Sequence, residues 1–141
     1  MTIKEIQEEI IDEFSMFEDW MERYEYIIDL GKSLAIIDDE FKKDENLIRG
    51  CQSKVWLHSE LKNDTLYFTA ESDAILTKGI VALLLRVFNE QTPADIIKAD
   101  MTFIDQIELK EHLSPTRANG LVSMIKQIKL YALAFQTKVN S

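Results

Sequence analysis

The 141-residue sequence holds little of several residue types that mark particular classes of protein. Its single cysteine, Cys51, cannot form an intramolecular disulfide, nor a thiolate zinc cage on its own. The longest uncharged apolar run, residues 79–85, is far too short to span a bilayer. The N-terminal segment mixes acidic with apolar residues and so lacks a signal-peptide core. These absences predict a cytoplasmic protein in a reducing compartment.

Positive charge is also scarce. Against 16 Lys and Arg stand 25 Asp and Glu, which gives a net charge of −9. Such a surface repels phosphate groups, and no stripe of basic residues interleaved with aromatic ones is visible. The sequence therefore predicts neither a nucleic-acid nor a membrane partner. A negative field instead favours a protein with a complementary basic patch.

The sequence does have the composition of a folded domain. Hydrophobic residues make up 46% and charged residues 29%, and the length suits a single domain over residues 1–141. Thr2 and Glu5 have capping-box spacing and predict the start of a first helix. A second helix is expected from Asp19 to Gly31, where glycine can take the left-handed conformation that ends a helix.

The clearest β signal lies in the middle of the chain. Residues 54–61 and 65–70 are rich in strand formers, and residues 63–64, Asn-Asp, supply turn chemistry between them. This pattern predicts an antiparallel hairpin. Residues 46–49 are expected to add a short third strand.

Helices are predicted again after the hairpin. An apolar helix over residues 74–89, capped by Ser72 or Asp73, is expected at the centre of the core. A short helix should open at residues 92–93 and a long one at residues 114–115, each with Pro at its first position. The element order predicts an α+β fold with a small antiparallel sheet of about three strands flanked by helices.

Cys51 is the main candidate for chemistry. It lies in the polar segment Gly50-Cys51-Gln52-Ser53, directly before a predicted strand. Gly50 permits a sharp turn or the close approach of another surface, and Arg49 can favour the reactive thiolate. A lone cysteine is often buried and inert, so the residues alone leave an inert and a functional thiol equally open.

Other site chemistries find little support. A cysteine protease needs a histidine base close to Cys51. His58 lies about 20 Å away if the chain stays extended, and nothing in the sequence places His112 nearby. No zinc or iron–sulfur ligand spacing, calcium loop or phosphate-binding loop is present. Gly79 and Gly120 are isolated glycines within predicted helices and are expected to allow close helix packing.

Several segments, in order, resemble segments of the SufE and CsdE family. Residues 46–56, NLIRGCQSKVW, resemble the active-cysteine segment of that family. Residues 72–79, SDAILTKG, resemble the start of its central helix, and residues 112–121, HLSPTRANGL, resemble the segment that opens its last helix. Residues 92–96, TPADI, also have a counterpart, so the resemblance extends over nearly the whole chain.

The resemblance implies a SufE/IscU-like fold and a role in iron–sulfur cluster assembly. Cys51 would accept persulfide sulfur from a cysteine desulfurase of SufS or CsdA type, stimulate that enzyme and pass the sulfur to a downstream iron–sulfur scaffold protein. The chain would thus be a sulfurtransferase partner that is not self-sufficient as an enzyme. Pyridoxal phosphate belongs to the desulfurase, so neither a cofactor nor a metal is expected here.

Supporting roles are also expected around Cys51. Asp73 matches a family position associated with the desulfurase-facing surface, although it can equally cap a helix. Arg117 falls in the first turn of the last helix, where a cation is unfavourable, and is expected to contact the partner, the Cys51 loop or an acidic residue. The remaining candidates for loop support or partner binding are Arg49, Gly50, Gln52, Ser53, Lys54 and His112.

Two alternatives stay open for Cys51. It could be the centre of a thiol redox enzyme or sensor, oxidised by peroxide to sulfenic acid without any desulfurase. It could also be dispensable in a pure interaction module. For the carrier we expect Cys51 to rest in an apolar pocket near Trp56, Phe68 and the helix that begins at Ala74.

Overall fold

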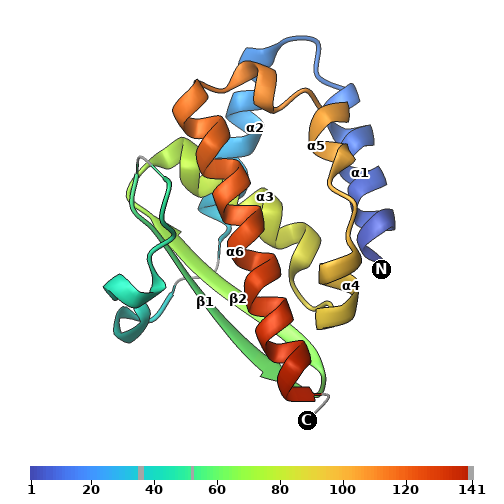
Figure 1. Ribbon diagram of the computed structural model, residues 1–141. Coiled ribbons are helices and arrows are strands. Elements are labelled where there is room, and N and C mark those ends of the chain that lie inside the picture. Colours follow the sequence, from blue (N-terminus) through green and yellow to red (C-terminus); the bar gives the residue numbers. More distant parts are fainter. Residues whose placement is uncertain (35–36, 52, 140–141) are drawn as a thin grey trace.

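The computed structural model describes residues 1–34, 37–51 and 53–139. Within them the chain forms six α-helices and a two-stranded sheet (Figure 1). The α-helices are α1 (Ile3–Ser15), α2 (Trp20–Lys32), α3 (Ile75–Phe88), α4 (Pro93–Lys98), α5 (Thr102–Gln106) and α6 (Pro115–Val139). The strands are β1 (Val55–Lys62) and β2 (Thr65–Ser72), and three short 3-10 helices are η1 (Asp39–Phe41), η2 (Asp44–Asn46) and η3 (Lys110–His112).

The predicted hairpin is confirmed. β1 and β2 pair antiparallel from Val55 opposite Ser72 to the two residues that flank the turn. Asn63 and Asp64 have φ angles of 52° and 64°, the positive values that a two-residue type I′ turn requires. Asn and Asp tolerate this conformation better than most residues, which explains why this dipeptide connects the strands.

The predicted third strand is reduced to a single bridge. Leu47 pairs with Trp56, and the Ile48 backbone N–H donates to the Val55 carbonyl at 2.8 Å. Pairing ends there because Gly50, at a φ of 93°, turns the chain away from β1. The fold is therefore α+β as predicted, with two strands in its sheet.

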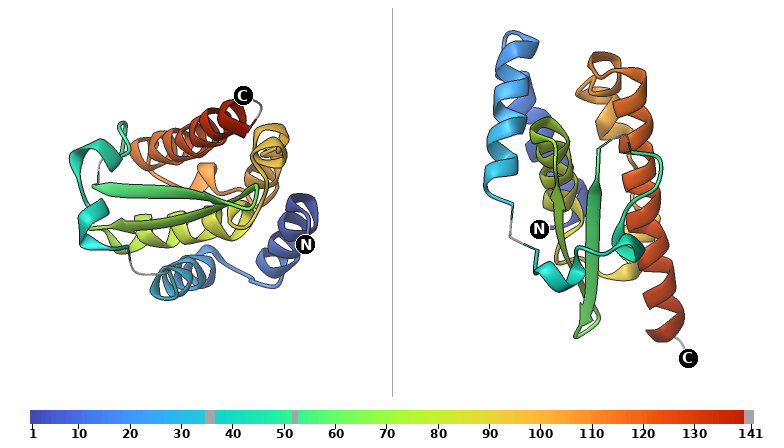
Figure 2. Two further views of the ribbon diagram at one scale, coloured as in Figure 1. Left: turned by 90° about the horizontal axis from the view of Figure 1, so that it is seen from below. Right: turned by 90° about the vertical axis from the view of Figure 1, so that its left-hand side faces the viewer.

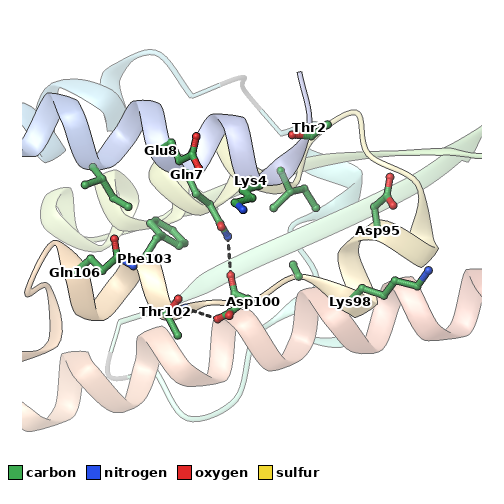
Figure 3. A pocket seen from close by; sticks show the side chains of 13 residues that line it. Thr2, Lys4, Gln7, Glu8, Asp95, Lys98, Asp100, Thr102, Phe103 and Gln106 are labelled. Atoms are coloured by element: carbon green, nitrogen blue, oxygen red, sulfur yellow. Dashed lines mark hydrogen bonds between the residues drawn. The ribbon is translucent and has the colours of Figure 1, made fainter.

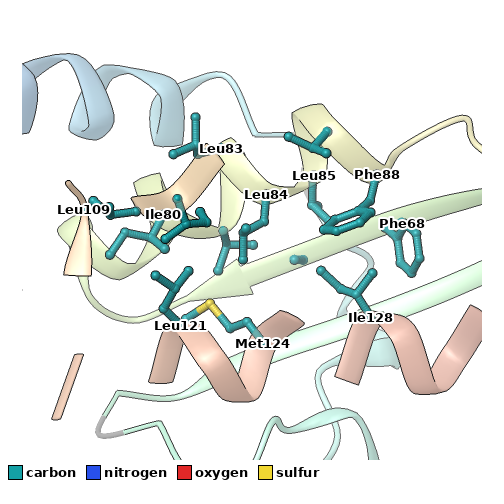
Figure 4. Close-up of a cluster of buried hydrophobic side chains, with 14 of the residues drawn as sticks. Phe68, Ile80, Leu83, Leu84, Leu85, Phe88, Leu109, Leu121, Met124 and Ile128 are labelled. Carbon is teal, nitrogen blue, oxygen red and sulfur yellow. The ribbon is translucent and has the colours of Figure 1, made fainter. Parts of the chain in front are cut away.

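Helix α3 forms the centre of the core (Figure 4). Helix α3 contacts β2 of the hairpin, α6, α1 and α2. The helices α1 and α2 lie on the side of α3 that faces away from the hairpin (Figure 2). The helix begins at Ile75, and no side chain caps its first turn. The predicted capping by Ser72 or Asp73 is therefore wrong. The Ser72 hydroxyl accepts from the Ala74 backbone N–H at 3.3 Å, but Ala74 precedes the first residue of the helix.

The N-terminal helices begin where the sequence predicts. Thr2 and Glu5 form the full capping box of α1, and the Asp19 side chain accepts from the backbone of α2. The predicted role of Gly31 is wrong, because α2 continues through it to Lys32. Gly31 instead lies against Gly79 of α3, where an added Cβ atom would sit 2.9 Å from the Gly79 backbone nitrogen. Close packing at Gly79 is confirmed.

Candidate functional site

The Cys51 loop lies directly against α6. A Cβ atom added to Gly50 would sit 2.5 Å from the Ser123 hydroxyl, and the φ of 93° is one that other residues rarely adopt. Glycine at this position thus satisfies both requirements, a turned backbone and a close approach. The consequence is that Cys51 reaches the interior side of the loop, between α3 and α6.

The Cys51 thiol is half-buried and turned towards Gly120 of α6. Its Sγ donates a long hydrogen bond to the Gly120 carbonyl oxygen at 3.7 Å. A Cβ atom at Gly120 would lie 3.4 Å from the same sulfur. Gly120 was expected to allow helix packing, but its absent side chain instead makes room for the thiol.

A small pocket adjoins the sulfur. Its cavity volume is about 10 Å³, on the order of the room for one water-sized group. Ser53 contributes from the loop, and the helices contribute Thr77, Ile80, Thr116, Arg117, Gly120 and Met124. The expected pocket is therefore present, but of the described residues neither Trp56 nor Phe68 lines it.

Burial raises the pKa of the Cys51 thiol. The sequence suggested the opposite, a thiolate favoured by Arg49. Arg49 is exposed, and in the described part of the chain no ion pair includes it. The resting site therefore favours the neutral thiol, because the sulfur is shielded from water.

Asp73 fastens the other end of the Cys51 loop. Its carboxylate accepts from the Lys54 backbone N–H at 3.0 Å, and its own N–H donates to the Lys54 carbonyl at 3.3 Å. These bonds extend the hairpin by one pair beyond Val55 and hold the segment that follows Cys51. Both Asp73 and Lys54 are exposed, and their contact with a partner stays a prediction.

Of the remaining predicted site residues, the structure places Arg117 at the Cys51 pocket and His112 away from it. Arg117 lines the Cys51 pocket, and no ion pair among the described residues includes it. His112 instead stacks on Trp20 of α2, with ring centres 3.9 Å apart, and is not among the residues that line the pocket. The predicted contribution of Gln52 falls outside the described residues.

A separate cavity of about 500 Å³ lies between α1 and the α4–α5 segment (Figure 3). Buried Gln7 crosses it and donates to the Asp100 carbonyl oxygen at 2.8 Å. None of the predicted site residues lines this cavity. Among the described residues no cluster of His, Cys, Asp or Glu could hold a metal ion, and no helix is long and apolar enough to cross a membrane.

Sequence reasoning missed most of the pocket wall. Thr77, Ile80 and Met124 come from α3 and α6, which lie far from Cys51 in the sequence. Besides Arg117, the sequence offered one further signal in Gly120, because a glycine inside a long helix costs about 1 kcal/mol relative to alanine and is kept only where something requires it. The structure supplies the reason in the thiol that faces it.

Comparison with known proteins agrees with this architecture. The family model SufE, described as an Fe-S metabolism associated domain, matches residues 8–132. An uncharacterized SufE-like protein of Rhizobium meliloti (strain 1021) is 40% identical over 127 residues, which cover 86% of this chain and 91% of that protein.

A solved structure shows the same fold. It is the solution structure of a hypothetical protein from Thermus thermophilus, with a TM-score of 0.78. The match covers 94% of this chain and 96% of that one at 13% identity, and therefore shows the fold alone. The family match over residues 8–132 and the 40% identity to a SufE-like protein show that this chain belongs to the SufE family of Fe-S metabolism.

Proposed function

We propose that the chain accepts persulfide sulfur on Cys51 from a cysteine desulfurase of SufS or CsdA type and delivers it for iron–sulfur cluster assembly. The observation that carries this proposal is the position of Cys51, the chain's one cysteine, at a pocket with room for about one small group. A sulfur carrier needs one thiol and a sheltered place for one additional atom. A second thiol nearby would convert the persulfide to a disulfide.

The transfer step balances without an oxidant or a reductant. The Cys51 thiol loses its proton, and the thiolate attacks the terminal sulfur of the donor's persulfide. The bond between the two donor sulfurs breaks as a new sulfur–sulfur bond forms on Cys51. The donor cysteine leaves as a thiolate and can take up a proton from solvent.

The raised thiol pKa suits a carrier better than a peroxide sensor. Sensor cysteines are accessible and have a low pKa, because the thiolate is the form that reacts with peroxide. Burial has the opposite effect on Cys51. In the carrier, the donor would draw the loop outward and bring the Cys51 sulfur to the donor's persulfide. A cytoplasmic location, stimulation of the desulfurase and delivery to a scaffold protein are parts of the same proposal.

Intact-protein mass spectrometry tests the proposal. The purified chain is mixed with a SufS-type desulfurase and free cysteine, and wild type should gain sulfur that reductant removes. Cys51→Ser is the matched control, which keeps the fold and should gain none. A desulfurase that is itself loaded while wild type gains nothing would refute the carrier function. Oxidation of Cys51 by peroxide at high rate without the desulfurase would favour the redox alternative.

A further inference from the structure

Helix α6 is apolar on two faces, and only one of them is covered by the fold. Its inner face packs into the core through Leu121, Met124, Ile128 and Ala132. Its outer face exposes Val122, Leu130 and Leu133 by 49%, 47% and 53% of their surfaces. A helix at the surface of a globular protein usually has charged or polar residues on that side. The outer face of α6, defined here as Val122, Lys126, Leu130 and Leu133, therefore calls for an explanation.

A cavity of about 250 Å³ opens on this face, between α6 and α4. Ile97, Leu130 and Leu133 form its apolar lining. Lys129 also borders it, but its ammonium donates to the Ile97 and Ala99 carbonyl oxygens at 3.3 and 2.7 Å and is held at the end of α4. Lys126 lies exposed beside the cavity. The cavity is therefore apolar inside, with the positive charge of Lys126 at its edge.

The charge of α6 differs in sign from the rest of the chain. Residues 115–139 include four basic residues and no acidic one. All 25 acidic residues and the other 12 basic ones lie elsewhere, so the remainder carries −13. A two-fold dimer through α6 would bring together two helices whose charged residues are all basic, which is electrostatically unfavourable. A partner with carboxylates around an apolar side chain is complementary to it.

The outer face of α6 is continuous with the Cys51 site. Gly50 lies against Ser123, the residue after Val122, and Gly120 contacts the thiol one turn earlier. Gly120 and Leu133 are about 20 Å apart along the helix at 1.5 Å per residue. A protein interface of ordinary size covers roughly 800 Å² of each partner and can include both.

We propose that the outer face of α6 is the docking surface for the sulfur donor, through an apolar side chain of the donor surrounded by carboxylates. This inference rests on the proposed function. The donor must bring its persulfide to Cys51, and the loop that carries Cys51 lies against this helix, so the donor's surface would also cover the adjoining part of α6.

The test compares two substitutions that place a carboxylate at an exposed apolar position. Leu130→Glu alters the outer face of α6, and Met21→Glu, at a residue 67% exposed at the start of α2, is the control. The half-saturating concentration of the chain is measured for Cys51 loading by a SufS-type desulfurase. Leu130→Glu should raise it about tenfold or more, as expected for an interface anchor, and Met21→Glu should leave it unchanged. Lys126→Glu should raise it less and should weaken its dependence on salt.

The outcomes separate this inference from the proposed function. Titration of the desulfurase with the chain, with binding monitored by fluorescence, measures the affinity of docking even where Cys51 takes up no sulfur. Docking that Leu130→Glu weakens, without sulfur transfer, supports the surface and refutes the carrier function. Sulfur transfer with the same half-saturating concentration in Leu130→Glu and wild type overturns the surface alone. Circular dichroism confirms that each variant is folded, and a wild-type dimer that Leu130→Glu dissociates without any effect on the desulfurase would also overturn the inference.

Discussion

Glycines bring two pairs of segments unusually close together, and the atoms that they approach differ in kind. Between α2 and α3, Gly31 and Gly79 meet backbone: a Cβ atom at Gly79 would lie 2.1 Å from the Ile27 carbonyl oxygen. At the functional site, Gly50 and Gly120 approach side chains. Their added Cβ atoms would lie 2.5 Å from the Ser123 hydroxyl and 3.4 Å from the Cys51 sulfur.

This difference separates stability from function. A backbone carbonyl inside a helix cannot retreat without moving the helix, so the α2–α3 contact fixes the spacing of two elements of the core. A hydroxyl or a thiol can rotate away from an added methyl group, but the Cys51 sulfur and its loop then no longer hold the same positions against α6. We therefore expect substitutions at the first contact to destabilise the fold and substitutions at the second to alter the thiol.

The largest expected effect is that of Gly79→Ala. The added methyl group overlaps the Ile27 carbonyl, and the free energy of unfolding should fall by about 3 kcal/mol or more, beyond the roughly 1 kcal/mol that alanine contributes to a helix. Urea denaturation measures this loss. Asn119→Ala, at an exposed position of α6, is the control and should change stability by less than about 0.5 kcal/mol. A loss below about 1 kcal/mol for Gly79→Ala would show that α2 and α3 can separate freely.

Gly50→Ala should have a smaller effect on stability and a clear one on sulfur loading. The positive φ and the Ser123 hydroxyl each oppose a side chain here, and strain of this kind costs about 1–3 kcal/mol. The double variant Gly50→Ala/Ser123→Gly should recover the loss of stability that is due to the Ser123 hydroxyl, but not the loss that is due to the positive φ. Denaturation and loading of Cys51 are measured on the single and double variants. Equal stability of Gly50→Ala and wild type would contradict a fixed loop on α6.

The elements that could be predicted from the sequence are those set by neighbouring residues. The capping box of Thr2 and Glu5, the start of the second helix near Asp19 and the Asn63-Asp64 turn depend on contacts within a few positions, and the structure confirms all of them. The α+β fold and the SufE family assignment were likewise correct. In these cases residue type and spacing were sufficient, because the competing conformations cost local hydrogen bonds or backbone strain.

What could not be predicted depends on segments far apart in the chain. Gly31 has the local pattern of a helix end, yet it lies within α2 because Gly79 of α3 packs against it. Asp73 looks like a helix cap, but the start of β1 brings the Lys54 N–H within its reach. Most of the pocket wall comes from α3 and α6, which lie far from Cys51 in the sequence but next to it in the fold. No spacing rule links Cys51 to Gly120.

The smallest expected change in stability, and the sharpest test of the comparison, belongs to Gly120→Ala. Alanine favours the helix by up to about 1 kcal/mol but crowds the Cys51 sulfur, so the net change should stay within about 1 kcal/mol. The thiol should move towards solvent, and its pKa should fall towards the ordinary value of about 8.5. Alkylation by iodoacetamide, measured against pH, should therefore reach its half-maximal rate at lower pH than in wild type.

The pH dependence of stability is an independent measure of whether Gly120→Ala moves the Cys51 thiol towards solvent. Because burial raises the pKa of Cys51 in the folded protein, its contribution to stability is complete below the pKa of the unfolded thiol and is lost as pH rises through the folded pKa. Gly120→Ala should lose less stability over this alkaline range than wild type does, and Gly79→Ala, at matched temperature below its Tm, should lose as much as wild type. An unchanged or higher alkylation midpoint in Gly120→Ala would mean that Gly120 does not set the position of the thiol. Opposite results for the two glycines would separate the contact that holds the fold from the contact that holds the sulfur.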